Sequence, residues 1–254
     1  MAINKITGTP FTDIEKLIGV SKTSIASVSG VTTAASGIVT ANLRNKYTPA
    51  NYSGTGALLD EIGSQDISIS GATYSSTQPA NFDFDGVNDY GASSTATWTA
   101  ADLSVGWWFN QDDLNGIQVQ ASLYGGTGTQ GLFPYTFISA GARVRWTNAS
   151  NQFTETTYLS RSGFPRNQWV YIGVSRTNST QKLNLYLGTS SGLTQYVTNF
   201  SVPSATTFTN SSIIYGSIDF PFDGSLGEYH IYNSVLSTAD WTQNFNALKG
   251  YYGL

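Results

Sequence analysis

The chain has 254 residues, a formal net charge of −4 and no cysteine. Its length can hold one large domain with a full hydrophobic core, and the lack of cysteine excludes a disulfide framework and a thiolate zinc site. With 12 Lys and Arg against 16 Asp and Glu, and no basic cluster, we expect neither a nucleic-acid partner nor a polybasic membrane contact.

The first segment, residues 1–38, contains a repeated pattern. The stretches INKITGT, IEKLIGV and IASVSGV each read Ile-x-x-apolar-x-Gly, at a spacing of 11 residues. Each repeat supplies too few apolar side chains for a core of its own. Two interpretations stay open: a flexible leader, or an anchor that docks on a partner. The candidate docking residues are Ile3, Ile6, Ile14, Leu17, Ile25 and Val28.

Residues 39–254 predict a second domain built of strands. In residues 65–75, Ile67 and Ile69 alternate with polar residues, which indicates a strand with one buried face. Residues 103–110 are apolar on both faces, as in a central strand. Strands without a helical period between them favour an antiparallel sandwich. Further strands are expected at 142–148, 168–176, 182–188, 212–218 and 227–233.

One short C-terminal helix is predicted. Ser237 is a suitable N-cap and Asp240 follows three positions later, as in a capping box. Trp241 and Phe245 fall on one helical face, and Gly250 ends the pattern. We expect this face to pack on the sandwich.

Four stretches carry a family resemblance: NFDFDGVNDYGAS (81–93), LSVGWWFN (103–110), NQWVYIGVSR (167–176) with KLNLYLG, and the closing segment 222–254. They resemble the concanavalin A-like, laminin-G-like jelly roll, in the version found in virion structural proteins of tailed bacteriophages. The resemblance covers about residues 40–254. It implies an all-β, two-sheet antiparallel jelly-roll sandwich of lectin-like architecture. It does not fix a function, because this fold hosts lectins, glucanases and structural domains.

The sequence offers no catalytic constellation. Glycosidases need two carboxylates flanking one bond, and the Glu-x-Asp-x-Glu strand that hydrolases of this fold share is missing. His230 is the only histidine, and no G-x-S-x-G elbow occurs. We therefore predict a non-enzymatic protein with His230 packed in a strand.

The stretch FDFDGVNDYG (82–91) contains several oxygen donors. Its glycine spacing does not fit an EF-hand. The donors Asp85, Asn88 and Asp89 stay weak calcium candidates, although we predict no cofactor. The structural alternative is a strand end followed by a turn, which the second Phe-Asp-Gly at 222–224 supports.

A carbohydrate surface would need exposed aromatic rings beside arginines. The candidates are Trp108, Arg143, Arg145 and Trp146. The alternative interpretation is that both tryptophans belong to the core and both arginines to the solvated surface.

The first hypothesis is a non-enzymatic structural virion protein of a tailed phage, a capsid-surface decoration or appendage protein. Its N-terminal segment would attach it to other capsid or tail proteins. The alternative is a glycan-binding adhesin, such as a tail-fibre or surface lectin. MAINKITGTP lacks a signal-peptide apolar stretch, so we expect synthesis in a host cytoplasm and localisation to the virion. A homo-oligomer is left open.

Overall fold

The computed structural model describes residues 37–99, 102–113, 116–125, 131–137, 141–148, 152–204, 207–217 and 219–254. The chain divides into two units, residues 1–36 and 37–254. The six candidate docking residues Ile3, Ile6, Ile14, Leu17, Ile25 and Val28 lie outside the described residues. Their docking role and the predicted boundary between residues 38 and 39 stay predictions.

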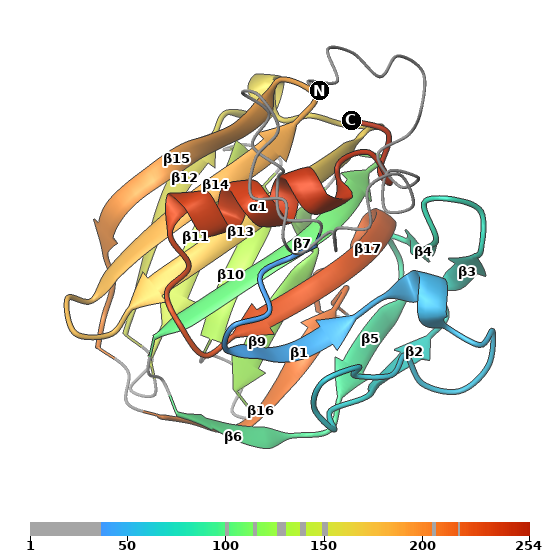
Figure 1. Ribbon diagram of the computed structural model, residues 1–254, viewed down its shortest axis with the longest axis horizontal. Coiled ribbons are helices and arrows are strands. Elements are labelled where there is room, and N and C mark those ends of the chain that lie inside the picture. Colours follow the sequence, from blue (N-terminus) through green and yellow to red (C-terminus); the bar gives the residue numbers. More distant parts are fainter. Residues whose placement is uncertain are drawn as a thin grey trace, which may run out of the picture. The chain divides into compact units, whose positions relative to one another are not determined.

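The second unit is a sandwich of two antiparallel sheets (Figure 1). The first sheet has the order β15-β14-β13-β7-β17-β4-β3, with β1 also paired to β17. The second has the order β12-β11-β10-β9-β16-β5-β2, with β6 paired to β16 and β8 to β10. The predicted all-β, two-sheet antiparallel jelly-roll sandwich is confirmed.

The strands of the first sheet are β1 Leu43–Tyr47, β3 Thr73–Ser75, β4 Asn81–Asp85, β7 Leu103–Gln111, β13 Trp169–Thr177, β14 Lys182–Thr189, β15 Gly192–Ser201 and β17 Asp223–Tyr232. Those of the second are β2 Ile67–Ser70, β5 Tyr90–Ser93, β6 Ala96–Thr99, β8 Ile117–Val119, β9 Ala121–Gly125, β10 Gly131–Phe137, β11 Gly141–Thr147, β12 Phe153–Leu159 and β16 Thr207–Tyr215. In the described residues the helices are the 3-10 turns η3 Pro49–Asn51 and η4 Arg161–Gly163, and α1 Thr238–Leu248.

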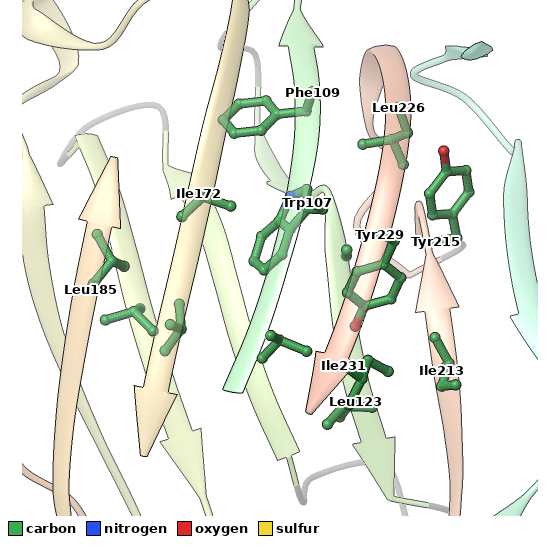
Figure 2. Close-up of a cluster of buried hydrophobic side chains, with 14 of the residues drawn as sticks. Trp107, Phe109, Leu123, Ile172, Leu185, Ile213, Tyr215, Leu226, Tyr229 and Ile231 are labelled. Carbon is green, nitrogen blue, oxygen red and sulfur yellow. The ribbon is translucent and has the colours of Figure 1, made fainter. Parts of the chain in front are cut away.

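The core lies between the two sheets. Strand alternation sends every second side chain inward, so Trp107 and Phe109 of β7 lie beside Ile172 of β13 (Figure 2). Leu123 of β9 and Ile213 of β16 approach from the second sheet (Figure 2). This contact between the inner faces holds the sandwich together through apolar burial.

The other face of the first sheet is covered by α1 (Figure 1). Gly106 of β7 and Gly173 of β13 are paired in register, and a Cβ on either would come within 2.8 Å of the Trp241 ring. The two glycines therefore form the depression in which Trp241 lies. Beneath the ring, Trp241 Nε1 donates to Ser175 Oγ at 2.8 Å, so the buried N–H is satisfied.

The predicted capping box at the start of α1 is confirmed. Ser237 Oγ accepts from Asp240 N, and the Asp240 carboxylate accepts from Ser237 N at 2.8 Å. Trp241 and Phe245 are buried, as predicted. In the part of the chain that the structure describes, no helix is both long and apolar enough to cross a membrane.

The single strand predicted at 65–75 is wrong. The segment forms β2 and β3, which belong to different sheets. Gly71 between them has φ +83°, a left-handed conformation that ends a strand. A Cβ at Gly71 would overlap the Asp89 carboxylate. Ile67 and Ile69 do pack on the core, as their alternation predicts, but the glycine break redirects the chain.

Candidate functional site: the β11–β12 surface

The most ligand-like surface lies on β11 and β12 at one edge of the second sheet. We call it the β11–β12 surface and define it by Arg143, Arg145, Phe153 and Glu155. On β11, Ala142, Val144 and Trp146 belong to the inter-sheet core. Strand alternation therefore puts Arg143 and Arg145 on the outer face, where both are half-buried.

Arg145 is held by two contacts. Its guanidinium carbon lies 3.7 Å from the centre of the Phe153 ring, a stacking distance for a cation on an aromatic face. Its Nε donates to Thr147 Oγ1 at 3.3 Å. Phe153 itself is 50% exposed, so the ring also presents apolar surface to solvent.

Arg143 is paired with Glu155. Arg143 Nη1 donates to Glu155 Oε1 at 2.5 Å, and the two side chains are 30% and 28% exposed. An ion pair this exposed contributes little to stability. Its main effect is to hold a carboxylate and a guanidinium side by side on the same face.

The register shows how the surface is assembled. Glu155 lies directly opposite Arg145, and Phe153 lies opposite Thr147. On the other side of β11, Arg145 pairs with Phe133 and Arg143 with Tyr135 of β10. Directly opposite residues of an antiparallel pair share one face of the sheet, so Glu155 lies on the same face as Arg145.

Of the two interpretations of Trp108 and Trp146, the structure agrees with the core one, because both rings are 0% exposed. Trp108 points away from the inter-sheet core, but α1 and the C-terminal residues cover it, and it stacks on Tyr252 with centroids 4.2 Å apart. Trp146 belongs to the inter-sheet core. Neither ring offers a face to a sugar in this structure.

Sequence reasoning missed Phe153 and Glu155. The signal was the alternation in QFTETTYL, which puts Phe153, Glu155 and Thr157 on one face of a strand. Which residues of β11 they oppose depends on strand pairing, which the alternation alone does not give.

Two of the calcium candidates, Asp85 and Asp89, accept hydrogen bonds from the backbone around the turn after β4. Asp85 Oδ1 accepts from Val87 N at 2.8 Å and from Asn88 N at 3.4 Å. Asp89 Oδ2 accepts from Asp85 N at 2.9 Å. The two carboxylates thus serve the turn after β4. Within the described ranges, no group of three or more His, Asp or Glu side chains is placed to hold a metal ion.

The two Phe-Asp-Gly stretches pair with each other. Asp85 lies opposite Asp223 in the β4–β17 ladder, and Gly86 N donates to Phe222 O at 3.1 Å. Phe84 and Phe222 are buried in the core. The two Phe-Asp-Gly stretches therefore lie opposite each other in the first sheet, at the junction where β4 ends and β17 begins.

Several aspartates lie close enough together at this junction to affect one another's pKa. Burial, followed by the neighbouring carboxylates of Asp113, Asp112, Asp83 and Asp85, raises the pKa of Asp223 above its ordinary value. Burial and the charges of Asp83 and Asp113 likewise raise the pKa of Asp112. These residues repel one another when they are charged.

His230 is packed in β17, as predicted. It is fully buried, and its Nε2 lies 2.7 Å from Glu228 Oε1. Lys46 Nζ of β1 lies 3.8 Å from the same oxygen. The pair lies almost entirely inside the protein, since the Glu228 side chain is 7% exposed and the His230 side chain 0%.

Comparisons with known proteins concern the fold. No protein-family model matches the chain, and no curated protein matches its sequence. Domain 4 of AbnA, a GH43 extracellular arabinanase from Geobacillus stearothermophilus solved with arabinotriose, is similar over 82% of this chain and 98% of that domain, with 16% identity and a TM-score of 0.61.

Two further solved structures share the fold. Trypanosoma rangeli sialidase matches with 12% identity and a TM-score of 0.60 over 84% of this chain. The binding domain of botulinum neurotoxin serotype G matches with 11% identity and a TM-score of 0.57 over 81% of this chain. The chain spans 34% of that sialidase chain and 50% of that toxin chain. At such identities the likeness establishes the two-sheet sandwich fold alone.

Proposed function

We propose that the chain is a non-enzymatic glycan-binding protein whose jelly-roll domain recognises a sugar through the β11–β12 surface. The observation that carries the proposal is the half-exposed Phe153 ring beside two arginines and a glutamate. Sugar rings pack on aromatic faces, and their hydroxyls accept from guanidinium groups and donate to carboxylates. All three kinds of contact are available on this one face.

The structural neighbours support the same class of ligand. Domain 4 of AbnA was solved with arabinotriose, and a botulinum neurotoxin DC binding domain with a TM-score of 0.59 was solved with SialylT. A shared sandwich does not transfer a ligand. It does make a glycan the first class of ligand to test.

A non-enzymatic role is supported by the contacts that two of the glutamates make. Glu155 is paired with Arg143, and Glu228 is buried with His230. A glycosidase needs two carboxylates on either side of one bond, whereas Glu155 is held in an ion pair with Arg143 and Glu228 lies in the interior with Lys46 and His230. The proposal includes no cofactor, so binding should be the same with and without calcium.

The location that we propose is the virion of a tailed phage, where the protein would act as a capsid-surface decoration or appendage protein held by residues 1–38. This proposed location rests on the sequence resemblance to virion structural proteins of tailed bacteriophages. Within the domain, residues 37 and 39 are held against α1, since Gln243 Nε2 donates to Gly37 O at 3.0 Å and Val39 N donates to Asn244 Oδ1 at 2.7 Å. Deleting residues 1–35 should abolish incorporation into particles, and normal incorporation would contradict the anchor.

Glycan binding is tested with the full chain on an array of neutral and acidic glycans, with and without calcium. Phe153→Ala should abolish binding of the glycan that scores highest. The control is Tyr196→Ala, since Tyr196 is a similarly exposed aromatic residue, on β15 of the first sheet. Binding to no glycan, or equal loss in both variants, would contradict the proposed site.

A further inference from the structure

The charge of the chain is unevenly distributed around the β11–β12 surface. Residues 131–166 contain four arginines, one glutamate and no lysine or aspartate, whereas the whole chain has a net charge of −4. Two of these arginines, Arg143 and Arg145, lie on the outer face of β11. A cationic face on an acidic protein favours an anionic ligand.

Arg145 is the arginine best placed to bind an anion. Stacking on Phe153 at 3.7 Å and the hydrogen bond from Nε to Thr147 Oγ1 orient its guanidinium. Among the described residues, Arg145 forms no ion pair. Its terminal nitrogens are therefore positioned before a ligand arrives, which lowers the entropy lost on binding.

Glu155 does not neutralise Arg145. It lies opposite Arg145 in the register, yet its Oε1 accepts from Arg143 Nη1 on the diagonal. Glu155 thus forms its ion pair with Arg143, and the guanidinium of Arg145 stays beside the exposed Phe153 ring without an ion pair among the described residues.

We propose that the ligand of the β11–β12 surface is an acidic glycan whose carboxylate is bound by Arg145. This inference rests on the proposed glycan-binding function. A planar carboxylate matches the guanidinium fork with two parallel hydrogen bonds. The sugar ring that carries the carboxylate packs on the exposed part of Phe153. Uronic acids and sialic acids share this chemistry.

The test compares ligands that differ only in the carboxylate. The full chain is titrated with polygalacturonate and with the same polymer fully methyl-esterified, and with sialyllactose and lactose. Dextran sulfate against dextran measures attraction to any polyanion. Tight binding of polygalacturonate or of sialyllactose, together with weak binding of both neutral partners and of dextran sulfate, supports the inference and identifies the source of the carboxylate.

Substitutions of Arg145 test whether this residue binds the carboxylate. Arg145→Gln should weaken binding of the acidic glycan roughly 10- to 100-fold, as expected for a charge-assisted bidentate contact. Arg145→Lys keeps the charge but loses the fork, so it should also weaken binding. The matched control is Lys182→Gln on β14 of the first sheet, where binding should change less than about 2-fold. The melting temperature of each variant shows whether it is folded.

The remaining outcomes contradict the acidic-glycan inference, and they show whether the proposed glycan-binding function fails with it. Equal binding of acidic and neutral glycans, or unchanged binding in folded Arg145→Gln, contradicts the inference and leaves glycan binding standing. Equal binding of dextran sulfate and polygalacturonate shows charge attraction without carboxylate recognition. Binding to no glycan contradicts both.

Discussion

The guanidinium of Arg176 lies 4.4 Å from the centre of the Trp146 ring, deep inside the sandwich. Arg176 comes from β13 of the first sheet and Trp146 from β11 of the second. The contact therefore joins the two sheets by a cation–π interaction, which is stronger when it is desolvated. Burial lowers the pKa of Arg176 to about 10, and the charge of Asp102 partly offsets this effect.

Replacing Arg176 should destabilise the fold. Arg176→Ala removes a fully buried side chain together with its contact to Trp146, and we expect a loss of about 2–4 kcal/mol in the free energy of unfolding. Arg176→Met, which refills the volume and contacts the ring through sulfur, should cost less than half as much. Urea denaturation measures both. The exposed Arg166→Ala is the control, and an equal effect there would contradict a role for the inter-sheet contact.

The glycine depression under α1 gives a second prediction. A Cβ at Gly173 would come within 2.7 Å of Trp241 Cε3, so Gly173→Ala should cost about 1–3 kcal/mol through overpacking. In a Trp241→Leu background the same change should cost under about 0.5 kcal/mol, because the clashing ring is gone. Denaturation of the four proteins of this cycle measures the coupling.

The control for this cycle is Gly250→Ala, where an added Cβ meets nothing within 4 Å. An equal cost of Gly173→Ala with and without the Trp241 ring would show that the backbone, and not the ring, requires glycine.

The aspartate junction should make the protein more stable as the pH falls from neutral. The raised pKa of Asp223 means that the folded chain binds the proton more tightly than the unfolded chain, whose ordinary value is 3.8. The charged form therefore costs stability above the raised value. This cost is relieved as the pH falls through that value, and is gone below 3.8. Asp223→Asn should stabilise the protein at neutral pH by a few tenths of a kcal/mol, since the group is partly solvated.

The measurement is the melting temperature as a function of pH, with Asp223→Asn showing a flatter profile than the parent. Added salt should narrow the gap between the two at neutral pH. Asp60→Asn should instead lower the melting temperature at neutral pH, because Asp60 Oδ1 accepts from Gly63 N and Ile62 N inside the fold. A neutral-pH loss of stability in Asp223→Asn would contradict repulsion at the junction.

Much of the fold could be predicted because local chemistry specified it. The Ser237 and Asp240 capping box, the two-sided apolar strand β7 and the paired Phe-Asp-Gly stretches are all visible in the sequence and occur as expected. The strand predicted at 65–75 failed because a single left-handed glycine, Gly71, redirects the chain. Pattern alone does not distinguish a glycine inside a strand from one that ends it.

The candidate site was predicted only in part, for a different reason. Arg143 and Arg145 are candidates because a carbohydrate surface needs guanidinium groups beside aromatic rings, and in the structure both lie on the outer face of β11. Trp146, on the opposite parity of the same strand, had to point inward, so the grouping of these three residues was inconsistent with strand geometry. Trp108 has the parity of an outer residue, and only the packing of α1 decides its burial.

Burial determines whether an aromatic residue contributes to stability or is available for binding, and Trp108 and Phe153 illustrate the two cases. Trp108 is enclosed by Tyr171, Phe245 and Tyr252, so Trp108→Ala should cost about 3–5 kcal/mol in the free energy of unfolding. Phe153→Ala removes a half-exposed ring and should cost less than about 1 kcal/mol while it abolishes glycan binding. Thermal melting and glycan titration of both variants test this pair. A folded Trp108→Ala protein that lost binding while Phe153→Ala retained it would move the site from the β11–β12 surface to the first sheet.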